Sequence, residues 1–200
     1  MDLPLRFGIT YDYLCPFARN ANEHVVRGLR AGATWEVTFL PFSLTQAKAA
    51  ESGEPRWDAP AVLRGSGLLA LAVAELVRVH ASERFLDAHL ELFALRHDRG
   101  EDLRDPDRVA QALERAGVMP SLVDRAEDGL EALRSTHEDL VAREVWGVPT
   151  LLTPSRAVFV RLLDRPGTDA APSIDRMARL VGMVEEEPML HEFKQVDLPR

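Results

Sequence analysis

Strand-like alternation of apolar and polar residues is confined to the two ends of this 200-residue chain. It occurs at residues 5–12 and 34–40, with helical spacing of apolar residues between them, and it returns at 150–153 and 157–160. A strand, a helix and a second strand in succession predict two parallel strands joined by a right-handed crossover. Residues 41–148 carry only helical signals. The chain is therefore predicted to form an α/β fold whose sheet is interrupted in sequence by a large all-helical insertion.

The helical signals of the middle segment predict about five helices. The apolar stripes that indicate them fall in residues 69–80, 86–93, 106–113, 120–129 and 130–144. The third stripe has helix-end signals on both sides, with Asp105 as N-cap, Pro106 at the first helical position and Gly117 beyond the last turn. A final helix is predicted to begin near Ser173 as its N-cap.

These patterns divide the chain into a core of residues 1–40 and 149–200 and an insertion domain of residues 41–148. A content of 46% hydrophobic and 28% charged residues is that of a globular protein and excludes a disordered chain. The net charge of −8 argues against nucleic acid as a partner. Because the sequence shows neither an apolar run of about 20 residues nor a signal-peptide pattern, we expect a cytoplasmic protein with no membrane partner. The oligomeric state does not follow from these features.

Cys15 is the single cysteine of the chain, which excludes intrachain disulfides and a zinc site made of several cysteines. It follows a predicted strand and precedes Pro16, which suits the first position of a helix. At such a helix start the amides of Phe17 and Ala18 can donate to the sulfur and stabilise a thiolate. We therefore predict a lowered pKa and a largely ionised Cys15 at neutral pH. The alternative interpretation is a small buried apolar side chain.

Two segments together resemble the DsbA-like branch of the thioredoxin superfamily. The first is Thr10–Ala18, in which a strand ends just before Cys-Pro-Phe-Ala, and the second is Trp146–Thr150, a Trp-Gly-Val-Pro-Thr run after the helical segment. The resemblance covers nearly the whole chain and implies a thioredoxin-like fold with the helical insertion between the second and third core strands. It also implies a cis peptide bond before Pro149, where the sequence alone favours a helix-terminating proline.

The resemblance implies a substrate-binding role for the backbone of Val148, Pro149 and Thr150, which would hold an extended peptide or a thiol ligand beside Cys15. The sequence departs from the family's dithiol pattern at Ala18, where a second cysteine normally stands. A mixed disulfide formed by Cys15 must then be attacked by a thiol from outside the chain.

A cytoplasmic subgroup linked to mycothiol-dependent reduction resembles this chain in the strand 157–160 and in the tail 190–196. Relatives in the same broad group include kappa-type glutathione transferases and hydroxychromene-carboxylate isomerases, which bind a low-molecular-weight thiol. A serine commonly replaces the cysteine in those relatives, so Cys15 favours redox chemistry.

The sequence therefore predicts a cytoplasmic monothiol thiol–disulfide oxidoreductase with Cys15 as nucleophile. Its cosubstrate would be a low-molecular-weight thiol, mycothiol or glutathione, with no tightly bound cofactor and no metal. Its partners would be small thiols, disulfides or extended peptides. Two alternatives remain, a transferase or isomerase that uses a bound thiol cofactor, and a peptide-binding module without catalysis.

Asp12 and Tyr13 are further candidates because they precede Cys15 and could position a proton or a ligand hydroxyl. Their other interpretation is a strand-end carboxylate and a half-buried ring. His80, His89 and His137 fall on apolar helix stripes, which is typical of core or boundary histidines.

Overall fold

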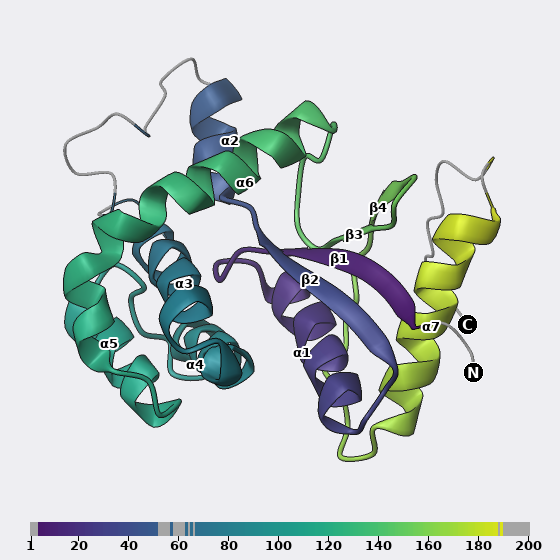
Figure 1. The fold of residues 1–200 in the computed structure, drawn as a ribbon, viewed down its shortest axis with the longest axis horizontal. Coiled ribbons are helices and arrows are strands. Elements are labelled where there is room, and N and C mark those ends of the chain that lie inside the picture. The colour runs from purple at the N-terminus through teal and green to yellow at the C-terminus, as the bar shows by residue number, and fades with distance from the viewer. Residues whose placement is uncertain are drawn as a thin grey trace, which may run out of the picture.

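Four strands form one mixed sheet in the order β2-β1-β3-β4 (Figure 1). The strands are β1 (Leu5–Tyr11), β2 (Trp35–Pro41), β3 (Thr150–Leu152) and β4 (Ala157–Phe159). β1 pairs in parallel with β2 and antiparallel with β3, and β3 and β4 form an antiparallel hairpin. This computed structural model describes residues 4–51, 57, 63, 65, 67–187 and 189. The tail 190–196 lies outside the described residues.

The first helix, α1 (Pro16–Arg30), connects the two parallel strands as predicted. Its N-cap is Cys15, and the chain leaves it through Gly32 at φ 84, a left-handed conformation that glycine adopts without strain. On its outer side α1 packs against α7 (Ala171–Glu186), the last helix (Figure 1). Cys15, the candidate nucleophile, therefore lies between β1 of the sheet and α1, a helix that packs against α7.

The segment between β2 and β3 is helical throughout its regular elements, which confirms the predicted insertion (Figure 1). Its elements are α2 (Leu44–Glu51), α3 (Leu68–His80), the 3-10 turn η2 (Ser82–Arg84), α4 (Phe85–His97), α5 (Pro106–Arg115), the 3-10 segment η3 (Pro120–Gly129) and α6 (Leu130–Ala142). α2 was not predicted from the sequence, and the fourth predicted helix is a 3-10 segment. Asp105 caps α5 by accepting hydrogen bonds from the amides of Asp107 and Arg108, as predicted. The division into two domains stays a prediction.

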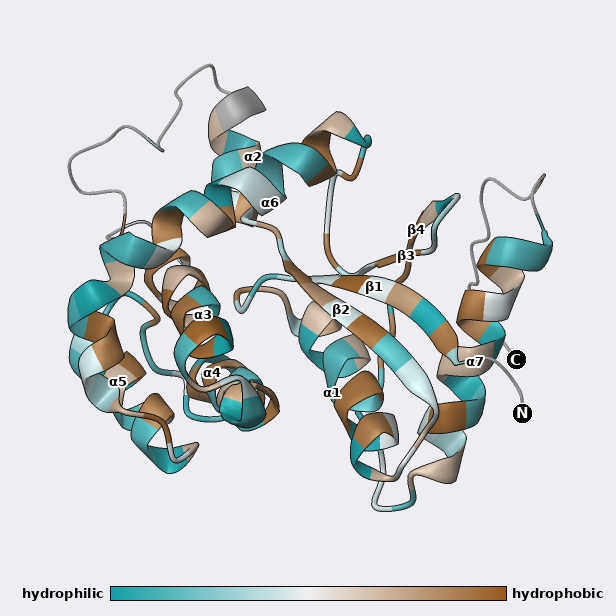
Figure 2. Cartoon of the chain, in the orientation of Figure 1, coloured by the Kyte–Doolittle hydropathy of each residue, from teal (hydrophilic) through white to brown (hydrophobic). Residues whose placement is uncertain are grey.

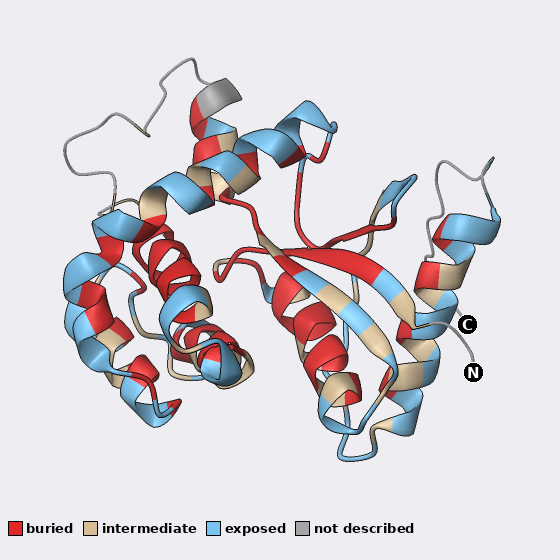
Figure 3. Ribbon diagram, viewed as in Figure 1, coloured by how far each residue is buried: buried red, intermediate tan, exposed pale blue. Residues whose placement is uncertain are grey.

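The buried apolar core continues from the sheet into the insertion. α3 is buried along its length from Leu68 to Val77 and is largely hydrophobic, as Figures 2 and 3 show. His89 of α4 lies among the rings of Tyr11, Phe39 and Phe93, which come from both parts of the chain. Sheet and insertion therefore share one packed interior.

Two expectations about individual side chains are wrong. Ser173 is inside α7 rather than at its start, because the helix already begins at Ala171. Its hydroxyl is buried and shares a hydrogen bond with Nδ1 of His24, 2.8 Å away. His80 is exposed, because α3 ends there and the apolar stripe leaves the core before it. Within the described part of the chain, no helix is long and apolar enough to span a bilayer.

Candidate active site

Cys15 is the N-cap of α1, with extended backbone angles of −95° and 117°. The amide of Ala18 donates a hydrogen bond to Sγ across 3.4 Å, and the amide of Phe17 also points to the sulfur. Pro16 occupies the first helical position, where an amide hydrogen would have no partner within the helix. The structure therefore places Pro16, Phe17 and Ala18 around the sulfur as the sequence predicts.

The segment before β3 lies against the same sulfur. The thiol of Cys15 donates to the carbonyl oxygen of Val148 across 3.4 Å, and the Val148–Pro149 peptide bond is cis. α6 ends at Ala142, so Pro149 does not terminate a helix. Within the described residues the Val148 amide, which belongs to a buried residue, donates no hydrogen bond. This amide is a free backbone donor next to the carbonyl that the thiol contacts.

Thr10 of β1 holds this segment in place. Its hydroxyl oxygen accepts a hydrogen bond from the Thr150 amide at 2.8 Å and its hydroxyl donates to the Gly147 carbonyl at 3.3 Å. The Thr150 hydroxyl also donates to the Gly147 carbonyl, at 2.8 Å. The amide and hydroxyl of Thr150 are thus used within the protein, and Pro149 has no amide hydrogen, so of these three residues Val148 is the one with a free amide. The sequence analysis missed Thr10, whose polar side chain inside a buried strand was the available signal.

The predicted ionisation of Cys15 is wrong for the protein without a bound substrate. Burial raises the pKa of the Cys15 thiol, because the thiolate loses hydration. Hydrogen bonds from the Ala18 and Phe17 amides and the charge of Arg161 lower this pKa, and the nearby carboxylate of Asp12 raises it. Desolvation is the largest of these effects, so Cys15 is a protonated thiol at neutral pH, consistent with its donation to Val148.

The chain is similar to known proteins in its three-dimensional structure. No family model matches the sequence, and no curated protein matches it. A periplasmic thioredoxin-like protein from Salmonella enterica serovar Typhimurium is similar with a TM-score of 0.61 and 19% identity, covering 90% of this chain and 84% of that one. The oxidoreductase NmDsbA1 from N. meningitidis has a TM-score of 0.57 and 13% identity, covering 94% and 87%. Cytosolic disulfide reductase DsbM from Pseudomonas aeruginosa with GSH has a TM-score of 0.58 and 11% identity, covering 92% and 99%.

The chain has the DsbA-like thioredoxin fold. Its order of elements, with a helical insertion between the second and third strands, agrees with the order that the sequence predicts. At identities this low the similarity describes the fold, and the chemistry has to be argued from the side chains of this chain.

In this DsbA-like fold, Asp12 ties the active-site loop to the insertion. Its fully buried carboxylate accepts hydrogen bonds from the amide of Leu14 at 2.9 Å and from the amide of Leu44, the first residue of α2, at 2.8 Å. Burial raises the pKa of Asp12 to about 6, against the lowering effect of these two amides. Both oxygens are used, so the geometry favours the structural interpretation of Asp12.

Tyr13 points away from Cys15 into the core. Its ring is fully buried rather than half-buried, and its hydroxyl lies 3.0 Å from Nδ1 of His89. Nε2 of His89 lies 3.1 Å from Oδ1 of Asn22, and the amide nitrogen of Asn22 donates to the Ala18 carbonyl at 2.8 Å. Burial lowers the pKa of His89 to about 3, so this histidine is a neutral core residue, as its position on an apolar stripe indicates.

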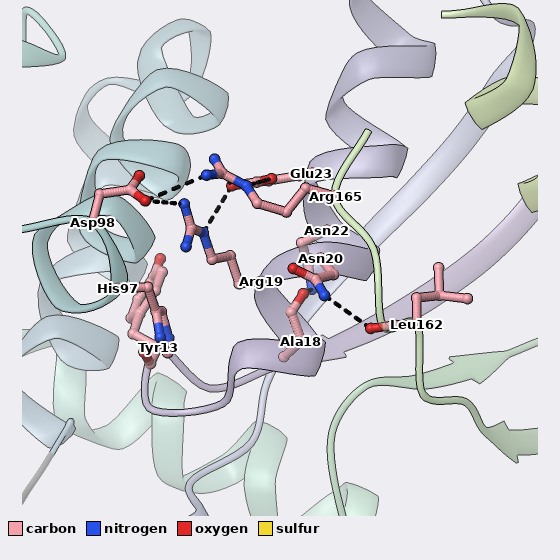
Figure 4. Close-up of polar contacts among 10 residues, drawn as sticks. All are labelled: Tyr13, Ala18, Arg19, Asn20, Asn22, Glu23, His97, Asp98, Leu162 and Arg165. Atoms are coloured by element: carbon pink, nitrogen blue, oxygen red, sulfur yellow. Dashed lines mark hydrogen bonds and ion pairs between the residues drawn. The ribbon is translucent and has the colours of Figure 1, made fainter. Parts of the chain in front are cut away.

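A charged cluster fixes α1 to the parts of the chain around it (Figure 4). The buried Arg19 pairs with Glu23 at 2.9 Å and with Asp98, which follows α4. Arg165, beyond β4, pairs with the same two carboxylates, at 2.7 Å with Glu23 and 3.3 Å with Asp98. Beside it, the side chain of Asn20 donates to the Leu162 carbonyl at 2.9 Å (Figure 4). The segment after β4 is thus held against the helix that carries Cys15.

A strip of three rings and one arginine, which the sequence analysis missed, borders the thiol. The guanidinium of Arg161 lies 4.8 Å from the ring centroid of Phe17 and 5.8 Å from that of Phe159. The ring of Trp146 lies 4.5 Å from that of Phe159, and Trp146 is 69% exposed. Because the four residues come from three distant segments, no local sequence signal joins them.

Proposed function

We propose that this chain is a thiol–disulfide oxidoreductase that works with one cysteine, and that Cys15 is its nucleophile. The observation that carries the proposal is the position of Sγ. It accepts a hydrogen bond from the Ala18 amide at the start of α1 and contacts the Val148 carbonyl beside Pro149. A sulfur in this position has amide donors for the thiolate on one side and backbone groups for a ligand on the other.

The reaction would be two thiol–disulfide exchanges. The Cys15 thiolate attacks one sulfur of a disulfide, forms a mixed disulfide and releases the other half as a thiolate. A second thiolate, from outside the chain, attacks this mixed disulfide, takes the substrate half into a new disulfide and returns Cys15 as a thiolate. In these two exchanges one external thiol takes the place of one half of the original disulfide, that half leaves as a thiolate, and Cys15 is unchanged at the end. Full reduction of the substrate half to a free thiol needs a second external thiol, which attacks the new disulfide, supplies the remaining electrons and leaves a disulfide of the two external thiols.

A small thiol in the role of external partner is supported by the absence of a second cysteine. Ala18 stands three residues after Cys15, where a thiol could otherwise resolve the adduct within the chain. We propose glutathione or mycothiol for this role, and the similar DsbM structure, which contains GSH, supports a ligand of this class. A reduced thiol in excess is a property of the cytosol, which is the compartment we propose.

The raised pKa of Cys15 sets the pH dependence of this reaction. Only a small fraction of the thiol is ionised at neutral pH, so the rate of exchange should rise with pH. Thiolates of high pKa are the stronger nucleophiles, and this offsets part of the decrease in rate that the small ionised fraction causes.

A second candidate function follows from the Cys15 thiol acting as a donor. A protonated cysteine that donates to Val148 could donate instead to the sulfur of a bound thiol cofactor and stabilise it as a thiolate. The protein would then be a transferase or isomerase that forms no disulfide.

Intact-mass spectrometry after incubation with oxidised glutathione or oxidised mycothiol tests the proposal. We expect one thiol adduct per chain, none in Cys15→Ser, and removal of the adduct by excess reduced thiol. A protein that forms no adduct across a pH range from about 6 to 9 would rule out the redox function. Conjugation of an electrophile to glutathione that survives in Cys15→Ser would support the second candidate.

A further inference from the structure

We infer that Arg161 selects substrates whose reacting sulfur is carried by a group with a carboxylate. This inference rests on the proposed function and names the class of disulfide that the site accepts. It follows from the position of Arg161, from the absence of a charge partner for it, and from the ligand-binding groups beside it.

Arg161 is held in place by contacts with α1, which carries Cys15, and with the segment around Pro149. Its guanidinium lies over the ring of Phe17, which is two residues after Cys15, at 4.8 Å from the centroid. The preceding residue, Val160, donates its amide to the Pro149 carbonyl at 3.0 Å, and the following residue, Leu162, accepts from Asn20 of α1 (Figure 4). The arginine is thus fixed between the helix that carries Cys15 and the strand segment opposite it.

No carboxylate neutralises Arg161 within the described residues. The two arginines that follow it in sequence do have acidic partners, Arg165 with Glu23 and Arg176 with Asp164. Among the described residues its guanidinium contacts the rings of Phe17 and Phe159, and these contacts leave the donors of the guanidinium fork free for a ligand. Its charge lowers the pKa of Cys15, so its field reaches the reacting sulfur.

The neighbouring groups form the rest of a binding site for such a substrate. The free Val148 amide can donate a hydrogen bond to a ligand carbonyl beside Cys15. The exposed ring of Trp146, which packs at a tilt against the ring of Phe159, offers an apolar surface at the other end of the strip. A carboxylate that pairs with the guanidinium would hold the substrate sulfur near Sγ, because the guanidinium lies over the ring of Phe17, two residues after Cys15, and its charge acts on the thiol.

The charge of the surroundings makes this arginine distinctive. The chain carries a net charge of −8, which repels anionic substrates from most of its surface. Asp12 is the carboxylate that raises the pKa of Cys15, and it is fully buried and hydrogen-bonded to two backbone amides. Arg161 is the cationic group that lowers the pKa of Cys15, so we expect it to attract an anionic disulfide to the site.

The rate of mixed-disulfide formation with three small disulfides tests this inference. The probes are dithiodipropionate, which is anionic, hydroxyethyl disulfide, which is neutral, and cystamine, which is cationic. We expect the wild-type protein to prefer the anionic over the neutral probe by about tenfold, and to react most slowly with cystamine. Added salt should reduce the preference. The ratio of the anionic to the neutral rate is the readout, because a changed ionisation of Cys15 cancels from it.

Three variants make the test specific. Arg161→Gln should bring the ratio close to one while Cys15 still reacts with the neutral probe, and Arg161→Lys should keep part of the preference. Arg125→Gln removes the same charge from η3, which packs on α3 and α5, and should leave the ratio unchanged. A wild-type ratio near one, or a ratio that Arg161→Gln leaves unchanged, would overturn the inference while the proposed function stands. Failure of Cys15 to react with any probe would overturn both.

Discussion

The Cys15 thiol and the Val148 carbonyl oxygen lie 3.4 Å apart, joined by a hydrogen bond in which the sulfur is the donor. Ionisation of Cys15 removes that hydrogen and leaves the Val148 carbonyl facing a thiolate. The same contact would have to open when a disulfide approaches Sγ. The resting site is therefore a protonated one, and its activation combines loss of a proton with loss of a contact.

The titration of Cys15 should show this directly. Because burial outweighs the amide hydrogen bonds, we expect the rate of alkylation by iodoacetamide to reach half its maximum above the pKa of a free thiol, about 8.5. Cys15→Ser gives the background rate of the remaining side chains. A midpoint clearly below 8 would show that the helix amides dominate after all.

A second thiol at position 18 should change the mechanism. Residues three apart at a helix start have Cβ atoms about 5–6 Å apart, a distance that a disulfide can bridge after a small adjustment. We expect Ala18→Cys to form an intrachain disulfide with Cys15 on oxidation and to shorten the lifetime of its mixed disulfide in the absence of external thiol. Titration of free thiols and mass spectrometry measure both effects.

The matched control for this variant is Ala18→Ser, which adds a side chain of similar size at the same fully buried position without a thiol. If its mixed disulfide decays as fast as that of Ala18→Cys, the effect comes from altered packing and the prediction is wrong.

Loss of the Thr10 hydroxyl should disturb the segment opposite Cys15. Thr10→Val keeps the shape of the side chain and leaves the buried Thr150 amide without its acceptor. We expect a loss of about 1–3 kcal/mol in the free energy of unfolding, together with slower exchange at Cys15 because Val148 is no longer held. Urea denaturation and the rate of adduct formation measure the two effects. Thr38→Val on the exposed side of β2 is the control, and equal losses in both variants would contradict a positioning role for Thr10.

The buried His89 should make the protein less stable in acid. Its pKa is about 3 in the folded protein and about 6.5 in an unfolded chain, so between these values the unfolded state binds the extra proton and stability falls as the pH is lowered. At pH 5 this amounts to about 2 kcal/mol from His89 alone.

We therefore expect the free energy of unfolding of His89→Gln to fall by about 2 kcal/mol less than that of the wild type between about pH 8 and pH 5. Urea titrations at the two values measure it. The acid effect of His137, with a folded pKa of about 4, and the opposite effect of Asp12 are present in both proteins and cancel in the comparison. Parallel pH profiles would show that His89 is protonated in the fold.

Local sequence patterns were sufficient for most of the architecture. The alternation in residues 5–12 and 34–40 and the Cys15–Pro16 pair carry their own geometric signals, a period of two and a helix start, and both were predicted correctly. α2 was missed because its eight residues have a weak apolar stripe. Ser173 was misassigned because an N-cap and a buried helical serine look alike in sequence.

The features that depend on distant segments could not be predicted in this way. The pKa of Cys15 is set by burial, which the whole fold imposes, whereas the sequence shows only the helix start that opposes it. Arg161 acquires its position through Phe17 and Phe159 and through the hydrogen bond of Leu162 to Asn20. Resemblance to a family supplied Val148 and Pro149, and it gave no information on these tertiary effects.

The partners of His89 come from outside the insertion, and this has a consequence for any attempt to shorten the chain. Its imidazole, which belongs to the insertion, forms hydrogen bonds with Tyr13 and Asn22 on either side of Cys15 in sequence. A version reduced to the sheet, α1 and α7 would remove His89, the hydrogen-bond partner of the Tyr13 hydroxyl and of Oδ1 of Asn22, beside the turn that presents the thiol. The helical insertion thus supports the two sides of the turn that carries Cys15. Removing it would require Tyr13 and Asn22 to be redesigned as well.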